Sequence, residues 1–207
     1  MKNKPLRQVN IKIFGAIDET NQIKYYNSGK KIKRRNKMLN EKIEKAITAQ
    51  INEELYSSYL YLAMAAHLSN IGLNGFANWM NIQVQEEMNH AKFFFNFVLE
   101  RGGKVNLEQI AKPPSEWENI TQIFEETVKH EKYISSKIND IATLALEEKD
   151  HATASFLRWF IDEQVEEEAT AEDWLNKLKL TKAEGTALFF LDQEAAKRVF
   201  VQPVMKA

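Results

Sequence analysis

Four long stretches of this sequence place apolar residues three, four and seven positions apart, the spacing that returns to one face of an α-helix. They extend from about Asn40 to Asn70, Asn74 to Arg101, Ser115 to Glu148 and Asp150 to Lys179. Glycines that follow the first two stretches, at Gly72 and Gly102-Gly103, are typical stop signals. The pattern therefore predicts four long helices.

Two short motifs predict where later helices begin. Ser115-Glu116-Trp117-Glu118 has the pattern of a capping box, in which a serine and a glutamate three residues later bond the free N–H groups of a first turn. It predicts the start of the third helix. Thr181-Lys182-Ala183-Glu184 has the same pattern and predicts a short fifth helix, which contains Leu188, Phe189, Phe190 and Phe200.

The lengths of the connections predict the topology. Only a few residues join the first helix to the second and the third to the fourth, so each pair is expected to form an antiparallel hairpin. About a dozen residues, including Pro113-Pro114, separate the second helix from the third, which is enough chain to travel the length of a bundle. The predicted fold is all-α: a four-helix bundle with one long crossover and a short C-terminal fifth helix.

The first 37 residues differ from the rest in charge. They hold eleven Lys and Arg against two acidic residues, a balance of +9, whereas the remainder holds 17 basic and 27 acidic residues, a balance of −10. Apolar residues alternate briefly at Val9, Ile11 and Ile13, and a basic run covers residues 30–35. We interpret residues 1–37 as a flexible basic extension, or as sequence translated ahead of a start at Met38, and residues 38–207 as the folded domain. Nucleic acid is disfavoured as a partner unless it binds through this basic segment. No aromatic residues are interleaved with the basic run, as an RNA-binding module would require.

Composition excludes several classes of protein. The 207 residues are 44% hydrophobic and 28% charged, with few Gly and Pro, which is ordinary for a globular protein. Because there is no cysteine, disulfides, zinc fingers, iron–sulfur clusters and thiol nucleophiles are excluded. No apolar run approaches the roughly 18 residues of a membrane span, and no signal-peptide segment follows Met1. We therefore expect a soluble, cytoplasmic protein.

The unusual residues are four glutamates, one on the apolar stripe of each long helix. Glu54, for example, has Ile47 seven residues before it and Tyr61 seven after it, all on nearly the same side of the helix. The four lie 13 to 17 residues from the turn within their hairpin, so they should meet in one layer at the middle of the bundle. They are Glu54, Glu87, Glu131 and Glu167.

This layer predicts a dinuclear metal centre. His90 follows Glu87 by three residues, an E-x-x-H pair on one helical face, and Gln164 precedes Glu167 by three. Four facing carboxylates in an apolar core repel one another and cost several kcal/mol each unless they are neutralised, and the stripes carry no Lys or Arg. Two divalent cations balance four negative charges. Oxygen donors with one imidazole suit iron or manganese better than copper(I) or structural zinc.

Four motifs carry this pattern, one on each helix: NEELYSSYLY at residues 52–61, QEEMNH at 85–90, KHE at 129–131 and EQVEEE at 163–168. With them, the chain from Met38 to about Val201 resembles bacterial non-haem ferritin. The resemblance implies a ferroxidase with two irons per subunit. The first iron would be bound by Glu54, Glu87 and His90, and the second by the bridging Glu87 with Glu131 and Glu167.

The resemblance also implies roles for neighbouring residues. Tyr61 would supply an electron, assisted by Trp159, and Gln164 would lie beside the centre and meet dioxygen or support a ligand. A third iron site would use Glu86, Glu163 and Glu166. Fe²⁺ would be oxidised by O₂ or H₂O₂ and stored as ferric mineral inside a homo-oligomeric shell of 24 subunits, with the fifth helix lining its four-fold axes.

Rival interpretations assign the chain to other classes of protein. Met88 stands where haem-containing bacterioferritins place their haem ligand, but those proteins carry E-x-x-H on the fourth helix, where this chain has Gln164 and Glu167, so haem is disfavoured. A rubrerythrin-type peroxidase would add a Cys-rich module. A DNA-protecting cage would place its metals between subunits and lack a fifth helix. A metal-free structural bundle would not need E-x-x-H.

Overall fold

The computed structural model describes residues 15–17, 23–25 and 38–205, and the chain divides into two units, Met1–Arg35 and Asn36–Ala207. In the first unit, two short strands, β1 (Gly15–Ile17) and β2 (Ile23–Tyr25), pair antiparallel with Gly15 opposite Tyr25. The sequence analysis did not predict this pair. The alternation at residues 9–13 and the basic run at 30–35 lie outside the described residues.

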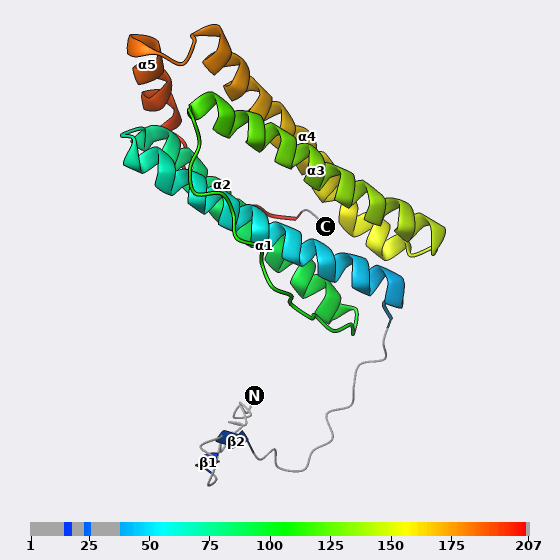
Figure 1. Cartoon of the computed structure of the whole chain (residues 1–207). Helices are drawn as coiled ribbons and strands as arrows, with labels where there is room; N and C mark the ends of the chain where they lie inside the picture. Colours follow the sequence, from blue (N-terminus) through cyan, green and yellow to red (C-terminus); the bar gives the residue numbers. More distant parts are fainter. Residues whose placement is uncertain (1–14, 18–22, 26–37, 206–207) are drawn as a thin grey trace, which may run out of the picture. The chain divides into compact units, whose positions relative to one another are not determined.

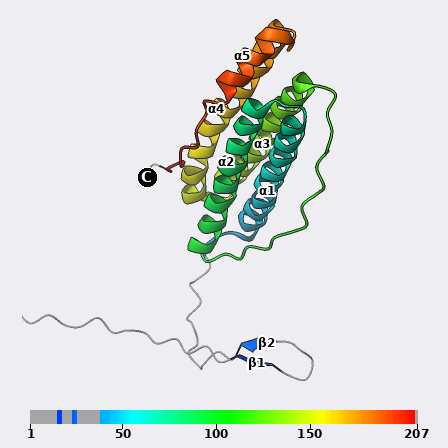
Figure 2. The same ribbon diagram turned by 90° about the vertical axis from the view of Figure 1, so that its left-hand side faces the viewer.

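The second unit is a bundle of four long helices with a short helix at one end (Figure 1). The helices are α1 (Glu41–Asn70), α2 (Asn74–Glu100), α3 (Ile120–Glu147), α4 (His151–Leu180) and α5 (Gly185–Ala195). Helix α1 packs against α2, and α3 against α4, while α1 also contacts α3. The segment between α2 and α3 runs the length of the bundle beside α1 (Figure 2). The predicted all-α bundle, crossover and fifth helix are therefore confirmed. Across the described residues, no helix combines the length and apolarity that crossing a bilayer demands.

The predicted start of the third helix is wrong by several residues. Helix α3 begins at Ile120, because the side chain of Asn119 accepts a hydrogen bond from the backbone N–H of Gln122, while the Gln122 side chain accepts from the N–H of Glu118. Trp117 is buried and donates to Glu126, which holds the preceding segment against the bundle. Ser115 therefore lies in the link and caps no helix.

The predicted start and length of the fifth helix are also wrong. Thr181 ends α4 and donates through Oγ1 to the carbonyl of Lys177, so it is not an N-cap. Lys182 and Ala183 have left-handed backbones, with φ of 56° and 49°, which separates the two helices. Helix α5 ends at Ala195, so Phe200 lies beyond it in the C-terminal segment.

A polar layer divides the core of the bundle into two apolar clusters. The cluster toward α5 includes Met64, Phe76, Phe124 and Trp174, and the cluster at the opposite end includes Ile47, Phe94, Ile138 and Phe160. The largest of these side chains are almost fully buried, and each contributes about 1.5–3 kcal/mol to stability. Between the clusters each long helix turns polar residues inward, so the bundle holds the layer in place from both sides.

Helix α5 docks closely on the first turn of α2. The side chain of Asp192 accepts a hydrogen bond of 3.0 Å from the backbone N–H of Phe76, a group that α2 leaves free because Leu73 provides no side-chain cap. Gly75 permits this approach, since a Cβ there would lie 1.7 Å from the carbonyl oxygen of Asp192. The contact directs the chain after α5 back along the bundle.

Candidate metal centre

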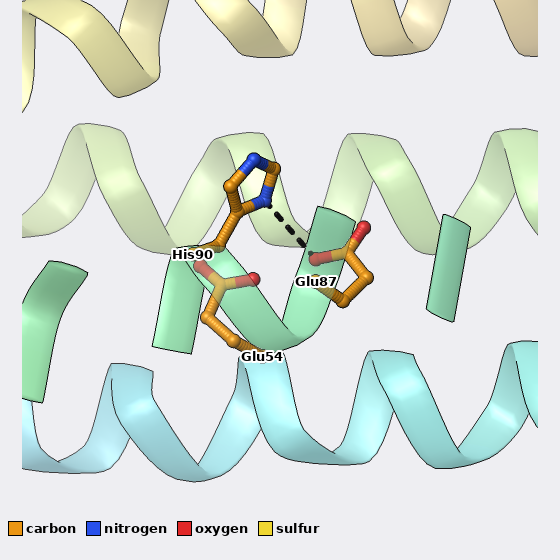
Figure 3. A group of neighbouring side chains, drawn as sticks. All are labelled: Glu54, Glu87 and His90. Carbon is orange, nitrogen blue, oxygen red and sulfur yellow. Dashed lines mark hydrogen bonds and ion pairs between the residues drawn. The ribbon is translucent and has the colours of Figure 1, made fainter. Parts of the chain in front are cut away.

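Three side chains from α1 and α2 form a compact group in the polar layer (Figure 3). Glu54 lies on α1, while Glu87 and His90 lie one helical turn apart on α2, and each residue is at most 2% exposed. One ligand atom from each lies within 4.8 Å of the others, and Nδ1 of His90 is 3.3 Å from a carboxylate oxygen of Glu87. Two carboxylates and an imidazole at this spacing can enclose one cation.

Two atoms of this group lack a hydrogen-bond partner. Oε2 of Glu54 and Nε2 of His90 are both fully shielded from solvent and unpaired. Leaving buried polar atoms unpaired costs about 1–3 kcal/mol each, so such atoms call for an explanation. A metal ion accepts lone pairs from both kinds of atom, and the residues present therefore fit a metal. The ring of His90 is kept in place by edge contacts with Trp159 and Phe160.

The other two carboxylates come from α3 and α4. Glu131 accepts hydrogen bonds from the hydroxyl of Tyr61 and from the side-chain amide of Gln164, the latter at 3.2 Å. Glu167 accepts a bond of 2.9 Å from the amide of Gln83. The structure thus brings together the four glutamates that the sequence placed in one layer, with Tyr61 and Gln164 beside them.

Burial and the proximity of the carboxyl groups to one another dominate the electrostatics of the polar layer. Burial and the neighbouring Glu87 raise the pKa of Glu54 well above its usual range, and burial with the carboxylates of Glu131 and Glu167 does the same to Glu87. Burial and Glu167 raise the pKa of Glu131 to about 8. Burial and Glu131 also raise the pKa of Tyr61. The carboxyl groups of Glu54, Glu87 and Glu131 therefore favour their protonated forms until a cation compensates the charge.

Glutamine side chains support the carboxylates, and the sequence analysis missed two of them. Gln50 donates to Glu54 at 2.9 Å, as Gln83 does to Glu167, and both glutamines are buried. Each precedes a glutamate of the layer by four residues on its own helix, which places it on the same inward face. A search for amides at this spacing would have found both.

The three glutamates expected to form a third iron site do not form a close ligand group among the described residues. Glu86 is ion-paired with Arg198 at 2.6 Å, and burial raises its pKa to about 7. Glu163 is half-buried and Glu166 exposed. Both line a cavity of about 640 Å³ that also contacts Trp159.

Two further residues lie near the layer. His130 bonds the hydroxyl of Ser57 at 2.7 Å and packs edge-on against Tyr61, and burial lowers its pKa to about 4, so it is neutral at pH 7. It therefore adds no charge to the carboxylates. Met88 is 38% exposed on α2.

Comparisons with known proteins agree with this architecture. Residues 44–181 match the ferritin family, described as a ferritin-like domain. The chain is 39% identical to a bacterial non-heme ferritin of Bacteroides fragilis over 161 residues, which cover 78% of this chain and 100% of that protein. It is 37% identical to a bacterial non-heme ferritin of Escherichia coli over 154 residues, which cover 74% of this chain and 93% of that protein.

Solved structures give the same result. An engineered closed form of the ferritin of Archaeoglobus fulgidus superposes with a TM-score of 0.78 at 47% identity, covering 79% of this chain and 99% of that chain. The open-pore ferritin of the same archaeon superposes with a TM-score of 0.77 at 47% identity, covering 78% of this chain and 99% of that chain. The resemblance inferred from the motifs is confirmed: this chain belongs to the ferritin family.

Proposed function

We propose that this protein stores iron and that each subunit oxidises Fe²⁺ at a dinuclear centre in the polar layer. Membership of the ferritin family supports iron storage. The oxidation chemistry is inferred from one observation above all. Glu54, Glu87 and His90 converge within 4.8 Å, and two of their buried atoms are unpaired.

The ligands divide between two positions. Glu54, Glu87 and His90 bind the first Fe²⁺, and Glu87 bridges to a second Fe²⁺ bound by Glu131 and Glu167. Four carboxylates then balance two divalent ions, which offsets the burial and the mutual repulsion that raise the pKa values of Glu87 and Glu131. Protons leave Glu54, Glu87 and Glu131 as the iron binds.

The second position favours release of the product. It has no histidine, since Gln164 lies beside Glu131 and donates to it without offering an imidazole. Two Fe²⁺ give two electrons to O₂ or H₂O₂, and the resulting Fe³⁺ leaves the weaker, all-oxygen position and joins the stored mineral. Tyr61, in contact with Glu131, is placed to supply a further electron, with Trp159 against His90 as a second donor.

The proposal includes a third iron position at Glu86, Glu163 and Glu166. It would require Glu86 to exchange its ion pair with Arg198 for a metal ion. The cavity beside Glu163 and Glu166 offers room for iron on its way out of the centre. We therefore place this site on the exit path rather than in the oxidation step.

Storage requires a closed assembly, and we propose a homo-oligomeric shell of 24 subunits. The described surface carries large apolar side chains that a shell would cover, with Tyr59 and Leu62 on α1 and Phe189 and Phe190 on α5 between 47% and 65% exposed. Helix α5 would lie at the four-fold axes. Solved relatives of the same fold are ferritins from Archaeoglobus fulgidus.

The test is an anaerobic titration with Fe²⁺ followed by exposure to oxygen. The protein should bind two Fe²⁺ per subunit and then show a fast rise in near-ultraviolet absorbance as Fe³⁺ forms. The His90→Ala variant should lose the fast phase, because the first position keeps only two carboxylates. His151→Ala is the matched control, since His151 is exposed at the start of α4. An unchanged rate in His90→Ala would refute the assignment.

A further inference from the structure

The segment that follows α5 returns along α2 and brings an arginine to the edge of the polar layer. The amide of Asn78 donates to the carbonyl of Arg198 at 3.0 Å, and the guanidinium lies 4.6 Å from the centre of the Trp79 ring. Farther on, Gln202 donates to Asn89 at 2.8 Å. The segment is thus attached to α2 at Arg198 itself and again four residues later at Gln202.

The guanidinium of Arg198 also bonds two polar residues of α2. Nη1 donates to Oε1 of Gln83, and Nη2 pairs with Glu86 at 2.6 Å. Gln83 is fully buried, and the other end of its amide donates to Glu167 at 2.9 Å. A continuous chain of hydrogen bonds therefore joins Arg198 to a carboxylate of the layer through one glutamine.

This chain has a defined direction. A side-chain amide has one accepting end and one donating end, and a guanidinium can only donate. Arg198 therefore holds the oxygen of Gln83 toward itself, which leaves the amide N–H groups for Glu167. Without Arg198 the buried oxygen would be unpaired, and an amide that turned over to relieve this would present its oxygen to the carboxylate, which repels it.

We propose that Arg198 is a positioning residue that acts through Gln83 to hold Glu167 in the orientation required by the second metal position. This inference rests on the proposed dinuclear centre. Partners that orient metal ligands in this way typically change metal affinity by about 10–100-fold when they are removed. The effect should fall on the position that uses Glu167 and leave the position formed by Glu54, Glu87 and His90 unchanged.

The experiment is a calorimetric titration of the assembled, metal-free full chain with Co²⁺. This divalent ion should bind the same ligands without being oxidised by air. Wild type should bind two Co²⁺ per subunit. Arg198→Met should weaken the second binding event by about tenfold and leave the first unchanged. Lys197→Met is the matched control: it removes the same charge from the adjacent, exposed position of the segment.

A double-mutant comparison separates positioning from a general loss of structure. Gln83→Met should weaken the second event as Arg198→Met does, and the double variant should be no weaker than Gln83→Met alone, because both changes break one chain. If Arg198→Met fails to assemble, Arg198→Lys takes its place. It keeps the positive charge but replaces the guanidinium with a single ammonium group, and it should also weaken the second binding event.

The outcomes are distinct. Wild type that binds fewer than two Co²⁺ overturns both the dinuclear centre and this inference. If wild type binds two Co²⁺ and the binding curve of Arg198→Met superimposes on that of wild type, the inference is overturned and the dinuclear centre stands. Additive effects of Gln83→Met and Arg198→Met, or equal weakening of both events, also overturn it, whereas selective and non-additive weakening establishes it.

Discussion

At the scale of single residues, Glu131 shows how the layer depends on cations. It is buried, it faces the carboxylate of Glu167, and burial is the largest cause of the rise of its pKa from 4.5 to about 8. The hydroxyl of Tyr61 and the amide of Gln164 lower the pKa but do not offset burial. Metal-free protein at neutral pH therefore keeps a proton on Glu131 that a metal ion must displace.

This proton predicts how the stability of the metal-free protein depends on pH. Between about pH 4.5 and 8 the folded chain holds a proton on Glu131 that the unfolded chain has lost, so the free energy of unfolding falls as the pH rises through this window. Each pKa unit corresponds to about 1.4 kcal/mol. Thermal unfolding of metal-free protein should therefore show a Tm that decreases from pH 5 to pH 8.

Variants and metal test the cause of that slope. Glu131→Gln should make the slope shallower, because Glu54 and Glu87 keep their raised pKa values, while Glu147→Gln, at an exposed position of α3, should leave the slope unchanged. Saturating Zn²⁺ should raise the Tm most at the alkaline end, because the carboxylates are then compensated. A metal-free Tm that rises with pH would show that the layer does not hold its protons.

Replacing Tyr61 is expected to change the products of oxidation. Two Fe²⁺ supply two electrons, enough to reduce O₂ to H₂O₂, and Tyr61 is placed to supply another. Tyr61→Phe keeps the buried volume but loses the hydroxyl that contacts Glu131, so it should release more H₂O₂ per O₂ consumed. An oxygen electrode measures this as the O₂ recovered after catalase is added.

Tyr133→Phe is the appropriate comparison for this variant. The Tyr133 hydroxyl bonds Glu53 at 3.1 Å on the surface, so its loss removes a similar group that bonds none of the proposed iron ligands. Equal H₂O₂ release from Tyr61→Phe and wild type would remove Tyr61 from the electron count.

At the scale of helices, the contact between α2 and α5 controls where the C-terminal segment goes. Gly75 lies against the backbone of Asp192, and the clash from an added methyl group cannot be relieved by turning a side chain. Asp192 also satisfies the N–H of Phe76. The first turn of α2 is thus completed by a residue more than a hundred positions away in the chain.

Gly75→Ala should therefore displace α5 from α2. We expect a loss of a few kcal/mol in the free energy of unfolding and faster cleavage of the C-terminal segment in limited proteolysis. Gly185→Ala adds the same methyl group where nothing lies within 4 Å, at a left-handed φ of 54°, and should cost only about 1–2 kcal/mol. Equal behaviour of the two variants would argue against the close contact.

At the scale of the whole molecule, the proposed shell makes the size of the particle a direct prediction. Light scattering after gel filtration should give a mass of about 24 subunits, because the exposed apolar residues of α1 and α5 need partners. A particle of 12 subunits would favour a DNA-protecting cage, and a monomer or dimer would favour an oxidase. A Soret band in the same sample would restore the haem alternative at Met88.

The first unit of the chain is expected to be dispensable for this assembly. Residues 36–207 contain the five helices of the described part of the chain and every residue of the proposed centre. A chain that starts at Met38 should form the same particle and oxidise Fe²⁺ at the same rate as the full chain. Loss of assembly in the shortened chain would contradict the division into an extension and a folded domain.

The sequence by itself determined the helices, their order and the inward glutamates, because helical spacing is a local property. Glu54 and His90 could be found from their positions on apolar stripes, and short connections predicted the hairpins. The caps of α3 and α5 were predicted wrongly, because the side chains of Asn119 and Thr181 bond nearby backbone groups that the two capping-box motifs were expected to satisfy or leave free.

Only the tertiary structure decided which groups support the centre. Gln83 bonds Glu167 on another helix, although its spacing points to Glu87, and Arg198 reaches Gln83 from 115 residues away. The close contact of α5 with Gly75 sets the return path of the segment that carries Arg198. Hydrogen bonds between distant segments depend on how helices pack, and no periodicity within one segment reports them.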